Sequence, residues 1–122
     1  MSILTYYHRQ HGEEKPLVWL HGQIRTPPLG TKARIEMGYN LRLLQQGAML
    51  GMPRSRPMKS IGRACHELRA RDAGVNWRLI YRVDDDAIVV VGVFAKTSRP
   101  AAERIVNICR RRLALYDAAA KG

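Results

Sequence analysis

The chain has 122 residues, of which 21 are Lys or Arg and 10 are Asp or Glu, so its formal net charge at pH 7 is +11. This length suits one domain that buries a core without disulfides. The two cysteines, Cys65 and Cys109, are too few for a disulfide framework or a cysteine-rich zinc site. No apolar run is long enough to cross a bilayer, and residues 1–15 lack the apolar core of a signal peptide. We therefore expect a cytoplasmic protein that needs no metal or cofactor.

The positive charge is concentrated in the second half of the chain. Residues 54–82 hold eight basic and two acidic residues, and residues 96–122 hold seven basic and two acidic ones. A strongly basic domain favours a polyanionic partner, and nucleic acid is the first candidate. The alternative is a basic surface that only keeps the protein soluble, and charge alone does not decide between the two.

The first predicted element is a short strand over Ile3–His8, which is rich in β-branched and aromatic residues. Pro16 suits a helix start, and apolar residues follow it at helical intervals as far as Ile24. This pattern predicts a first helix over residues 16–24. Thr26 to Gly30 contains two prolines and a glycine, which end that element.

A second helix is predicted from Thr31, as its N-cap, to about Gln46, with Gly47 ending it. Apolar residues recur on two of its sides. One stripe holds Ala33, Met37, Leu41, Leu44 and Ala48, and the other holds Ile35, Tyr39 and Leu43. A helix with two apolar sides is usually covered on both. We therefore expect it to pack between a sheet and the first helix.

After a loop at residues 51–57, three strands are predicted over residues 65–70, 76–83 and 87–95, with a short extra strand at 58–61 before them. Residues 72–74 and 84–86 have the composition of turns. The third strand is almost continuously apolar, which is typical of a central strand covered on both faces. In the first strand, residue alternation directs His66 and Arg69 to opposite faces.

The last predicted element is a helix from about Pro100 to Tyr116, and residues 118–122 are expected to fray. Its apolar stripe contains Ala102, Ile105, Val106, Cys109, Leu113 and Tyr116. The element order predicts a single α+β domain over residues 1–122, in which a helical pair backs a small, mostly antiparallel sheet.

Several pieces of this sequence, taken in order, resemble the RelE/ParE toxin superfamily, and most closely its phage-derived, HigB-like branch. The resemblance covers roughly residues 16–116. The pieces are Gly47 to Pro53 with Lys59, then His66-Glu67-Leu68-Arg69, then Trp77-Arg78-Leu79-Ile80-Tyr81, then Val93-Phe94-Ala95-Lys96-Thr97.

This resemblance implies a fold with two N-terminal helices packed on a small twisted antiparallel sheet, plus a C-terminal helix. It implies an mRNA interferase, an endoribonuclease that cuts ribosome-bound message. It also implies that a cognate antitoxin, usually a helix-turn-helix protein, keeps the toxin inactive.

Metal-independent RNA cleavage needs a proton acceptor, a proton donor and cations that stabilise the charge that develops on the phosphate. The resemblance implies that Arg69 and Arg78 contact the substrate phosphate and that Lys96 is the family lysine after Phe94. The strand predictions place Arg69 and Arg78 on neighbouring strands, where paired residues lie about 5 Å apart. His66 is the candidate acid or base because an imidazole ordinarily gains and loses a proton near neutral pH.

Each of these residues also has a purely structural interpretation. Arg69 can form a surface ion pair with Glu67 or Asp72, Arg78 can lie on a solvent-facing side, and Lys96 can be a charge at a strand edge. His66 is equally well explained as a partly buried structural residue. The remaining basic residues are candidates for contacts with RNA or the ribosome: Lys59, Arg63, Arg82, Arg99, Arg110, Arg111 and Arg112.

The leading hypothesis is thus an antitoxin-regulated, ribosome-dependent endoribonuclease. The alternative is a binding module without catalysis, either a gyrase inhibitor like the ParE branch or a phage accessory protein that binds nucleic acid. A departure from the family pattern keeps this alternative open, because Thr97 stands where many relatives carry a second lysine. A shared surface for Arg69, Arg78 and Lys96 would favour the nuclease.

Overall fold

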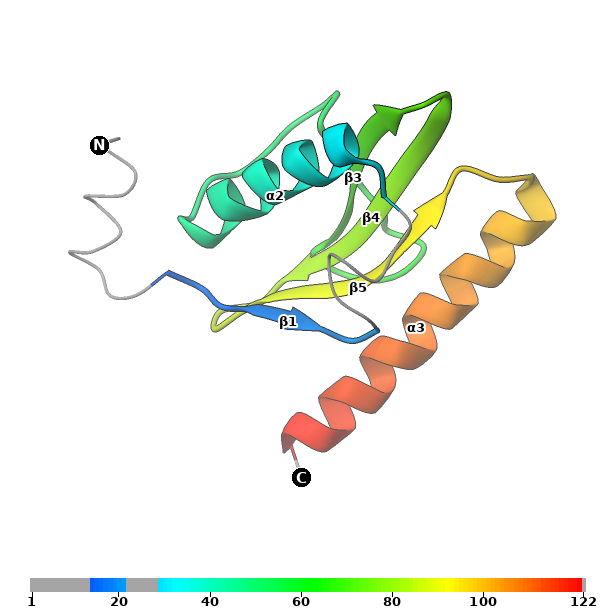
Figure 1. The fold of residues 1–122 in the computed structure, drawn as a ribbon. Coiled ribbons are helices and arrows are strands. Elements are labelled where there is room, and N and C mark those ends of the chain that lie inside the picture. The colour runs from blue at the N-terminus through cyan, green and yellow to red at the C-terminus, as the bar shows by residue number, and fades with distance from the viewer. Residues whose placement is uncertain (1–13, 22–28, 122) are drawn as a thin grey trace.

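The computed structural model describes residues 14–21 and 29–121, and these residues form one sheet with a helix on each face (Figure 1). The sheet has the strand order β1-β5-β4-β3-β2. Strand β1 runs parallel to β5, and the other neighbours are antiparallel. The elements are β1 (Leu17–Trp19), α2 (Thr31–Gln45), β2 (Ser55–Pro57), β3 (Cys65–Asp72), β4 (Val75–Val83), β5 (Ile88–Ala95) and α3 (Arg99–Lys121).

The predicted first helix is wrong where the structure describes it, because Leu17–Trp19 is strand β1. Leu17 and Trp19 pack on the α2 side of the sheet, whereas Val18 and Leu20 pack on the α3 side. Their burial therefore alternates with a period of two, and the apparent helical spacing was a coincidence of four apolar residues in a short segment. The described residues thus hold one helix before β2, not two. The strand predicted at 3–8 lies outside the described residues.

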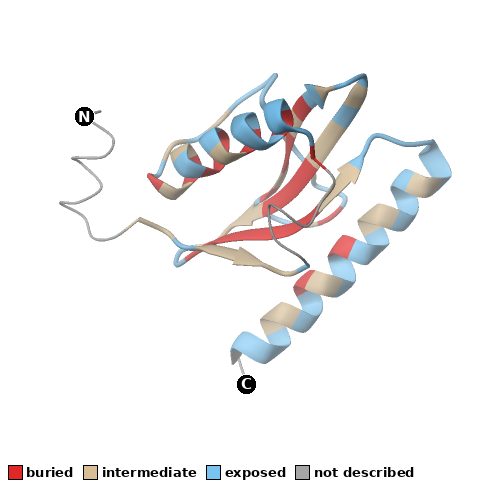
Figure 2. Cartoon of the chain, in the orientation of Figure 1, coloured by how far each residue is buried: buried red, intermediate tan, exposed pale blue. Residues whose placement is uncertain are grey.

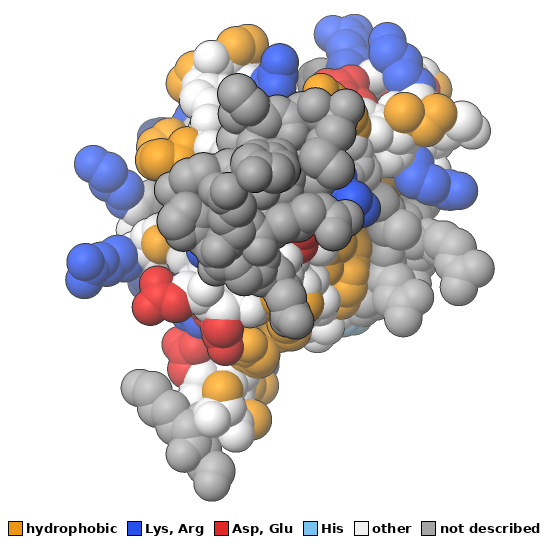
Figure 3. All heavy atoms as spheres, turned by 90° about the vertical axis from the view of Figure 1, so that its left-hand side faces the viewer, with side chains coloured by type: hydrophobic (Ala, Val, Ile, Leu, Met, Phe, Trp, Pro, Cys, Tyr) orange, Lys and Arg blue, Asp and Glu red, His pale blue; other side chains and the backbone are white. Residues whose placement is uncertain are grey.

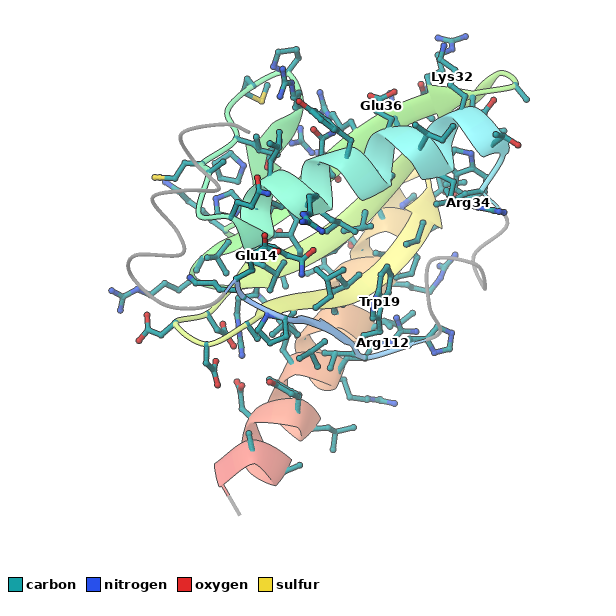
Figure 4. All side chains as sticks on the ribbon, turned by 60° about the vertical axis from the view of Figure 1, so that its left-hand side comes forward. Glu14, Trp19, Lys32, Arg34, Glu36 and Arg112 are labelled. Atoms are coloured by element: carbon teal, nitrogen blue, oxygen red, sulfur yellow. The ribbon has the colours of Figure 1, made fainter. Side chains whose placement is uncertain are left out.

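Helix α2 is confirmed, and among the described residues only one of its two apolar sides is covered. Ala33, Met37 and Leu41 are buried against the sheet. The second apolar stripe is exposed, with 68% of Ile35 and 62% of Tyr39 accessible to solvent. Figure 4 shows the outward side of α2, from which Lys32 and Glu36 project away from the sheet. Within the described residues the expected second covering layer is absent, because Leu17–Trp19, in the segment predicted to supply it, forms β1.

The two ends of α2 are fixed by different means. Gly47 adopts a left-handed conformation, with φ of 94°, and ends the helix as predicted. At the other end Gly30, and not Thr31, is the N-cap residue, and no side chain from the cap position bonds to the helix. The carboxylate of Asp72 on β3 instead accepts a hydrogen bond from the backbone N–H of Ala33 (3.0 Å). A side chain at Gly30 would overlap that carboxylate.

The three main strands are confirmed with nearly the predicted bounds. Strands β3 and β4 are joined by Ala73 and Gly74, both with positive φ (50° and 78°), which is the backbone of a tight two-residue hairpin turn. The short extra strand lies at Ser55–Pro57 instead of 58–61, and it pairs with β3.

Two hydrophobic cores lie on the two faces of the sheet (Figure 2). The α2 side contains Leu68, Leu79 and Tyr81, and the α3 side contains Ile80, Val89 and Cys109, among others. Strand β5 contributes to both, and residues 87–92 are buried throughout, as the continuous apolar run predicted.

Helix α3 continues past its predicted end at Tyr116 to Lys121, and it lies along one face of the sheet. Its predicted stripe is confirmed from Ile105 to Tyr116, because these residues pack in the α3-side core. Within the described ranges, no helix has the length and apolar character needed to cross a membrane.

Candidate active site

A row of the candidate site residues crosses three strands at one end of the sheet. Arg69 on β3 pairs directly with Arg78 on β4, and Arg78 pairs with Phe94 on β5. Lys96 follows β5 immediately, and its backbone N–H donates to the carbonyl of Asn76 (2.7 Å). The antiparallel register therefore brings together residues that are 27 positions apart in the chain.

These residues line a cleft of about 320 Å³ between the sheet and the first turns of α3. One part of its wall is cationic and another part is apolar. The lining residues are Arg56, Met58, Glu67, Arg69, Arg78, Ile80, Phe94, Ala95, Lys96, Thr97, Ala102, Ile105 and Val106. The structure thus places Arg69, Arg78 and Lys96 around one cavity, as the nuclease hypothesis requires.

A second, more open hollow adjoins the cleft and shares those three cations. It is polar, and its lining adds Glu36, Ala70, Arg71 and Asn76 to Arg69, Arg78 and Lys96. The three shared residues therefore stand between an apolar cavity on one side and a polar, basic hollow on the other.

Glu67 is the carboxylate around which the arginines of the cleft are arranged. Its side chain is 5% exposed, and its Oε1 accepts from Nη1 of Arg78 (2.6 Å) and Nε of Arg69 (3.3 Å). Arg69 and Arg78 are like charges placed directly opposite each other, an arrangement that is unfavourable without an intervening anion. The ion-pair interpretation of Arg69 is thus correct in part, and it coexists with the place of Arg69 in the cleft.

Arg56 belongs to the same group, and sequence reasoning missed it. It stands opposite Glu67 in the β2–β3 register, with its Nη2 3.5 Å from Oε1 of Glu67. Its Nε is buried and has no hydrogen-bond partner among the described residues. The predicted loop at 51–57 hid this residue, because only a strand paired with β3 brings it to Glu67. The signal available was the polar alternation in Arg54-Ser55-Arg56, which is short and weak.

His66 lies on the opposite face of the sheet from the cleft. Its ring stacks on Tyr81 with a centroid distance of 5.4 Å, and its Nδ1 is 3.2 Å from the carbonyl oxygen of Ala64. Both rings line a separate hollow beside the end of α2, near Leu44 and Met49. The hydroxyl of Tyr81 is 2.6 Å from that of Ser55, and burial raises the pKa of Tyr81. The structure therefore does not bring His66 to the three cations. On this face of the sheet, His66 cannot exchange a proton with a substrate bound in the cleft.

Among the other basic candidates, several side chains have partners inside the protein. Arg82 donates to both carboxylate oxygens of Asp84 and of Asp117, and these hydrogen bonds raise its pKa. Arg112 donates to the carbonyl of Val91 (2.9 Å) and lies over the ring of Phe94. Both residues hold α3 on the sheet, so the structure gives them a packing role.

The remaining candidates are exposed and do not line the cleft: Lys59, Arg63, Arg99, Arg110 and Arg111. Of these, Arg110 donates to the carbonyl of Ser60 (2.8 Å). Figure 3 shows Lys and Arg side chains in separate groups along the top and on the left of that view, and a group of acidic side chains below those on the left. The basic surface is thus broken up, and the cleft is one of several cationic regions.

The two cysteines are buried in the α3-side core and are free thiols. Burial raises the pKa of Cys109 to about 12 and raises that of Cys65 as well. Both thiols are therefore protonated at neutral pH, when the thiolate is the reactive form. They serve as small apolar core residues.

Residues 28–114 match the model of the family described as phage derived protein Gp49-like (DUF891). Neither the curated proteins nor the solved structures contain a significant match. The matched range covers well over half of the chain and includes α2, every strand from β2 to β5 and most of α3. The chain therefore belongs to the phage-derived Gp49-like family, which lies in the RelE/ParE-like toxin group.

Proposed function

We propose that this protein is a HigB-like toxin, a ribosome-dependent endoribonuclease that cuts messenger RNA without a metal ion. A cognate antitoxin with a helix-turn-helix domain would neutralise it. The observation that carries the proposal is the convergence of Arg69, Arg78 and Lys96 on one cleft. Family membership supports it, because the chain belongs to a group of toxins.

The proposed reaction is attack of a ribose 2′-oxygen on the adjacent phosphorus. The new 2′-oxygen–phosphorus bond forms as the bond from phosphorus to the 5′-oxygen breaks, which leaves a 2′,3′-cyclic phosphate and a 5′-hydroxyl. The 2′-hydroxyl loses its proton to solvent water, and the 5′-oxygen gains one from the Lys96 ammonium. DNA is not cut, because it lacks the 2′-hydroxyl.

The cleft residues would act mainly through charge. Arg69 and Arg78 carry fixed guanidinium donors that suit phosphate oxygens and neutralise the charge that grows on them. Lys96 is exposed beside them, and its ammonium can donate a proton to the departing 5′-oxygen. With His66 on the other face, electrostatic stabilisation is the principal contribution to catalysis. The exposed cations Lys59, Arg63, Arg99 and Arg111 remain available for ribosomal RNA.

The first test compares the wild-type protein with Arg78→Ala and His66→Gln, each induced in cells with message ends mapped by primer extension. New 5′ ends inside translated frames are expected for the wild type and for His66→Gln. Arg78→Ala should reduce them by about 100- to 1000-fold, the usual effect of removing one transition-state donor. Thermal unfolding of the purified variants checks that both fold.

Two results would contradict the proposal. The first is toxicity with intact message and inhibited gyrase, which would establish the ParE-like alternative. The second is cleavage that survives Arg78→Ala but not His66→Gln.

For the antitoxin, the product of the neighbouring reading frame should copurify with the protein and abolish cleavage. A neighbour without a helix-turn-helix domain would contradict that part.

A further inference from the structure

We propose that the apolar part of the cleft binds one unstacked nucleobase of a single-stranded RNA, next to the phosphate held by Arg69, Arg78 and Lys96. This inference rests on the proposed function and specifies its substrate. The ligand class is a nucleotide in a single strand, because a base that is paired and stacked in a duplex cannot enter a cavity.

The first support is the register of the sheet. Phe94, the one phenylalanine in the sequence, is the direct cross-strand partner of Arg78. Direct partners in an antiparallel pair have Cβ atoms about 5 Å apart on the same face. An aromatic ring and a guanidinium thus project from neighbouring strands on the same face, where one nucleotide could place its base against the first and its phosphate against the second.

The second support is the composition of the wall beyond Phe94. Met58, Ile80, Ile105 and Val106 complete an apolar surface between the sheet and α3. All four also belong to, or pack against, the α3-side core, so the cavity is bounded by rigid elements. A cavity of about 320 Å³ with apolar walls and a few charged groups is typical of a small-ligand site.

The third support is the position of Arg69, Arg78 and Lys96, which line both the apolar cleft and the neighbouring hollow and so lie between the two. The neighbouring hollow is polar, and to the three shared residues it adds Arg71, Asn76 and Glu36, so that four cations line it with one carboxylate. It suits the sugar-phosphate backbone on the far side of the scissile phosphate. A base on the apolar side and backbone on the polar side together match the chemical asymmetry of a nucleotide, and base–aromatic stacking tolerates any base. An apolar side chain of a protein partner would match only the apolar half.

Binding of a short single-stranded oligonucleotide tests the inference separately from cleavage. The strand is 2′-O-methylated so that it cannot be cut, and fluorescence anisotropy compares it with versions that carry one abasic site at each position in turn. The wild-type protein should lose at least about 5-fold in affinity when one particular base is missing. Phe94→Leu keeps the apolar wall but removes the aromatic face, so it should bind intact and abasic strands equally. Ile108→Ala, on the exposed part of α3 and outside the cleft, should behave as the wild type.

The results separate this inference from the proposed function. If the wild type binds every abasic strand as well as the intact one while Arg78→Ala weakens all of them, the phosphate site stands and the base subsite is wrong. If the wild type binds no strand at all, the base subsite is overturned, and the proposed function is decided separately by the mapping of message ends in cells. If Phe94→Leu loses the same affinity for intact and abasic strands, the ring acts only in packing and the inference is overturned.

Discussion

At the scale of single residues, Glu67 determines how the cations of the cleft are arranged. Its Oε1 lies 2.6 Å from Arg78, 3.3 Å from Arg69 and 3.5 Å from Arg56. Three guanidinium groups around one nearly buried carboxylate leave an excess of positive charge that faces the cleft. Glu67 is therefore a positioning residue in the proposed reaction.

Replacing Glu67 by Gln keeps the shape and removes the charge. The paired Arg69 and Arg78 would then repel each other and separate, so the cleavage rate should fall at least about 10-fold, while oligonucleotide affinity should stay equal or increase because the cleft becomes more positive. The free energy of unfolding should fall by about 1–3 kcal/mol, since buried donors lose a charged acceptor. Single-turnover cleavage, anisotropy and urea unfolding measure the three quantities.

Glu103→Gln is the matched control, because Glu103 is exposed on α3 and does not line the cleft. It should leave the cleavage rate and the stability unchanged. A parallel loss of affinity and rate in Glu67→Gln would mean that the variant has simply lost its structure, and unchanged cleavage would show that the arginines need no anchor.

At the scale of elements, the β3–β4 hairpin holds the site together, because its register sets Arg69 beside Arg78. The hairpin closes through Ala73 and Gly74, and both have positive φ. Gly74 adopts this conformation at no steric cost, whereas an alanine in the left-handed region is unfavourable by about 1 kcal/mol. The turn therefore carries a local strain at Ala73 that the strand pairing overcomes.

Ala73→Gly should stabilise the protein by about 0.5–1 kcal/mol, with the urea midpoint rising and the m-value unchanged. Gly74→Ala is the counterpart, and it should destabilise by about 1 kcal/mol or more. A side chain at Gly74 meets no atom within 4 Å, so its effect would come from the backbone alone. The two variants should change the free energy of unfolding in opposite directions. If Ala73→Gly destabilises the protein, the backbone at Ala73 is not strained.

At the scale of the whole molecule, the net charge of +11 is divided between internal contacts and available cations. Arg82 and Arg112 hold α3 on the sheet, whereas Arg69, Arg78 and Lys96 surround the cleft. Arg69 and Arg78 share a single carboxylate, that of Glu67, so the cleft keeps a surplus of positive charge, and this surplus can release counterions when a nucleic acid binds. The charge of the sequence thus overstates the charge that a substrate meets.

This division predicts the salt dependence of binding to the uncleavable strand. Arg69→Gln should reduce the magnitude of the slope of log affinity against log salt concentration by about 0.7, the value for one phosphate contact in a single strand. Arg42→Gln should not change the slope, because Arg42 lies on α2 outside the cleft and pairs with Glu14 at 3.4 Å. Equal slopes for all three proteins would show that the cleft does not bind the backbone.

The long helices and strands were predicted correctly from the periodicity of their apolar residues. The apolar stripe of α3, the helix from Thr31 and the three long strands were confirmed because many residues repeat one period. Residue alternation also placed His66 and Arg69 on opposite faces. The short β1 and β2 were missed, because each has only three residues and its identity comes from the neighbour with which it pairs.

What the sequence by itself determined is the alternation within each strand, and hence which side chains share a face, together with the excess of basic residues. It also indicated Arg69, Arg78 and Lys96 as candidate site residues, because the motifs that contain them resemble, in their order, those of the RelE/ParE superfamily. Only the tertiary structure decided the register between strands, and register decides which charges meet. That is why Glu67 became the centre of the arginine group, why Arg56 joined it, and why Phe94 came to lie beside Arg78. Distances between strands depend on pairing with distant segments, and no local pattern in the chain contains that information.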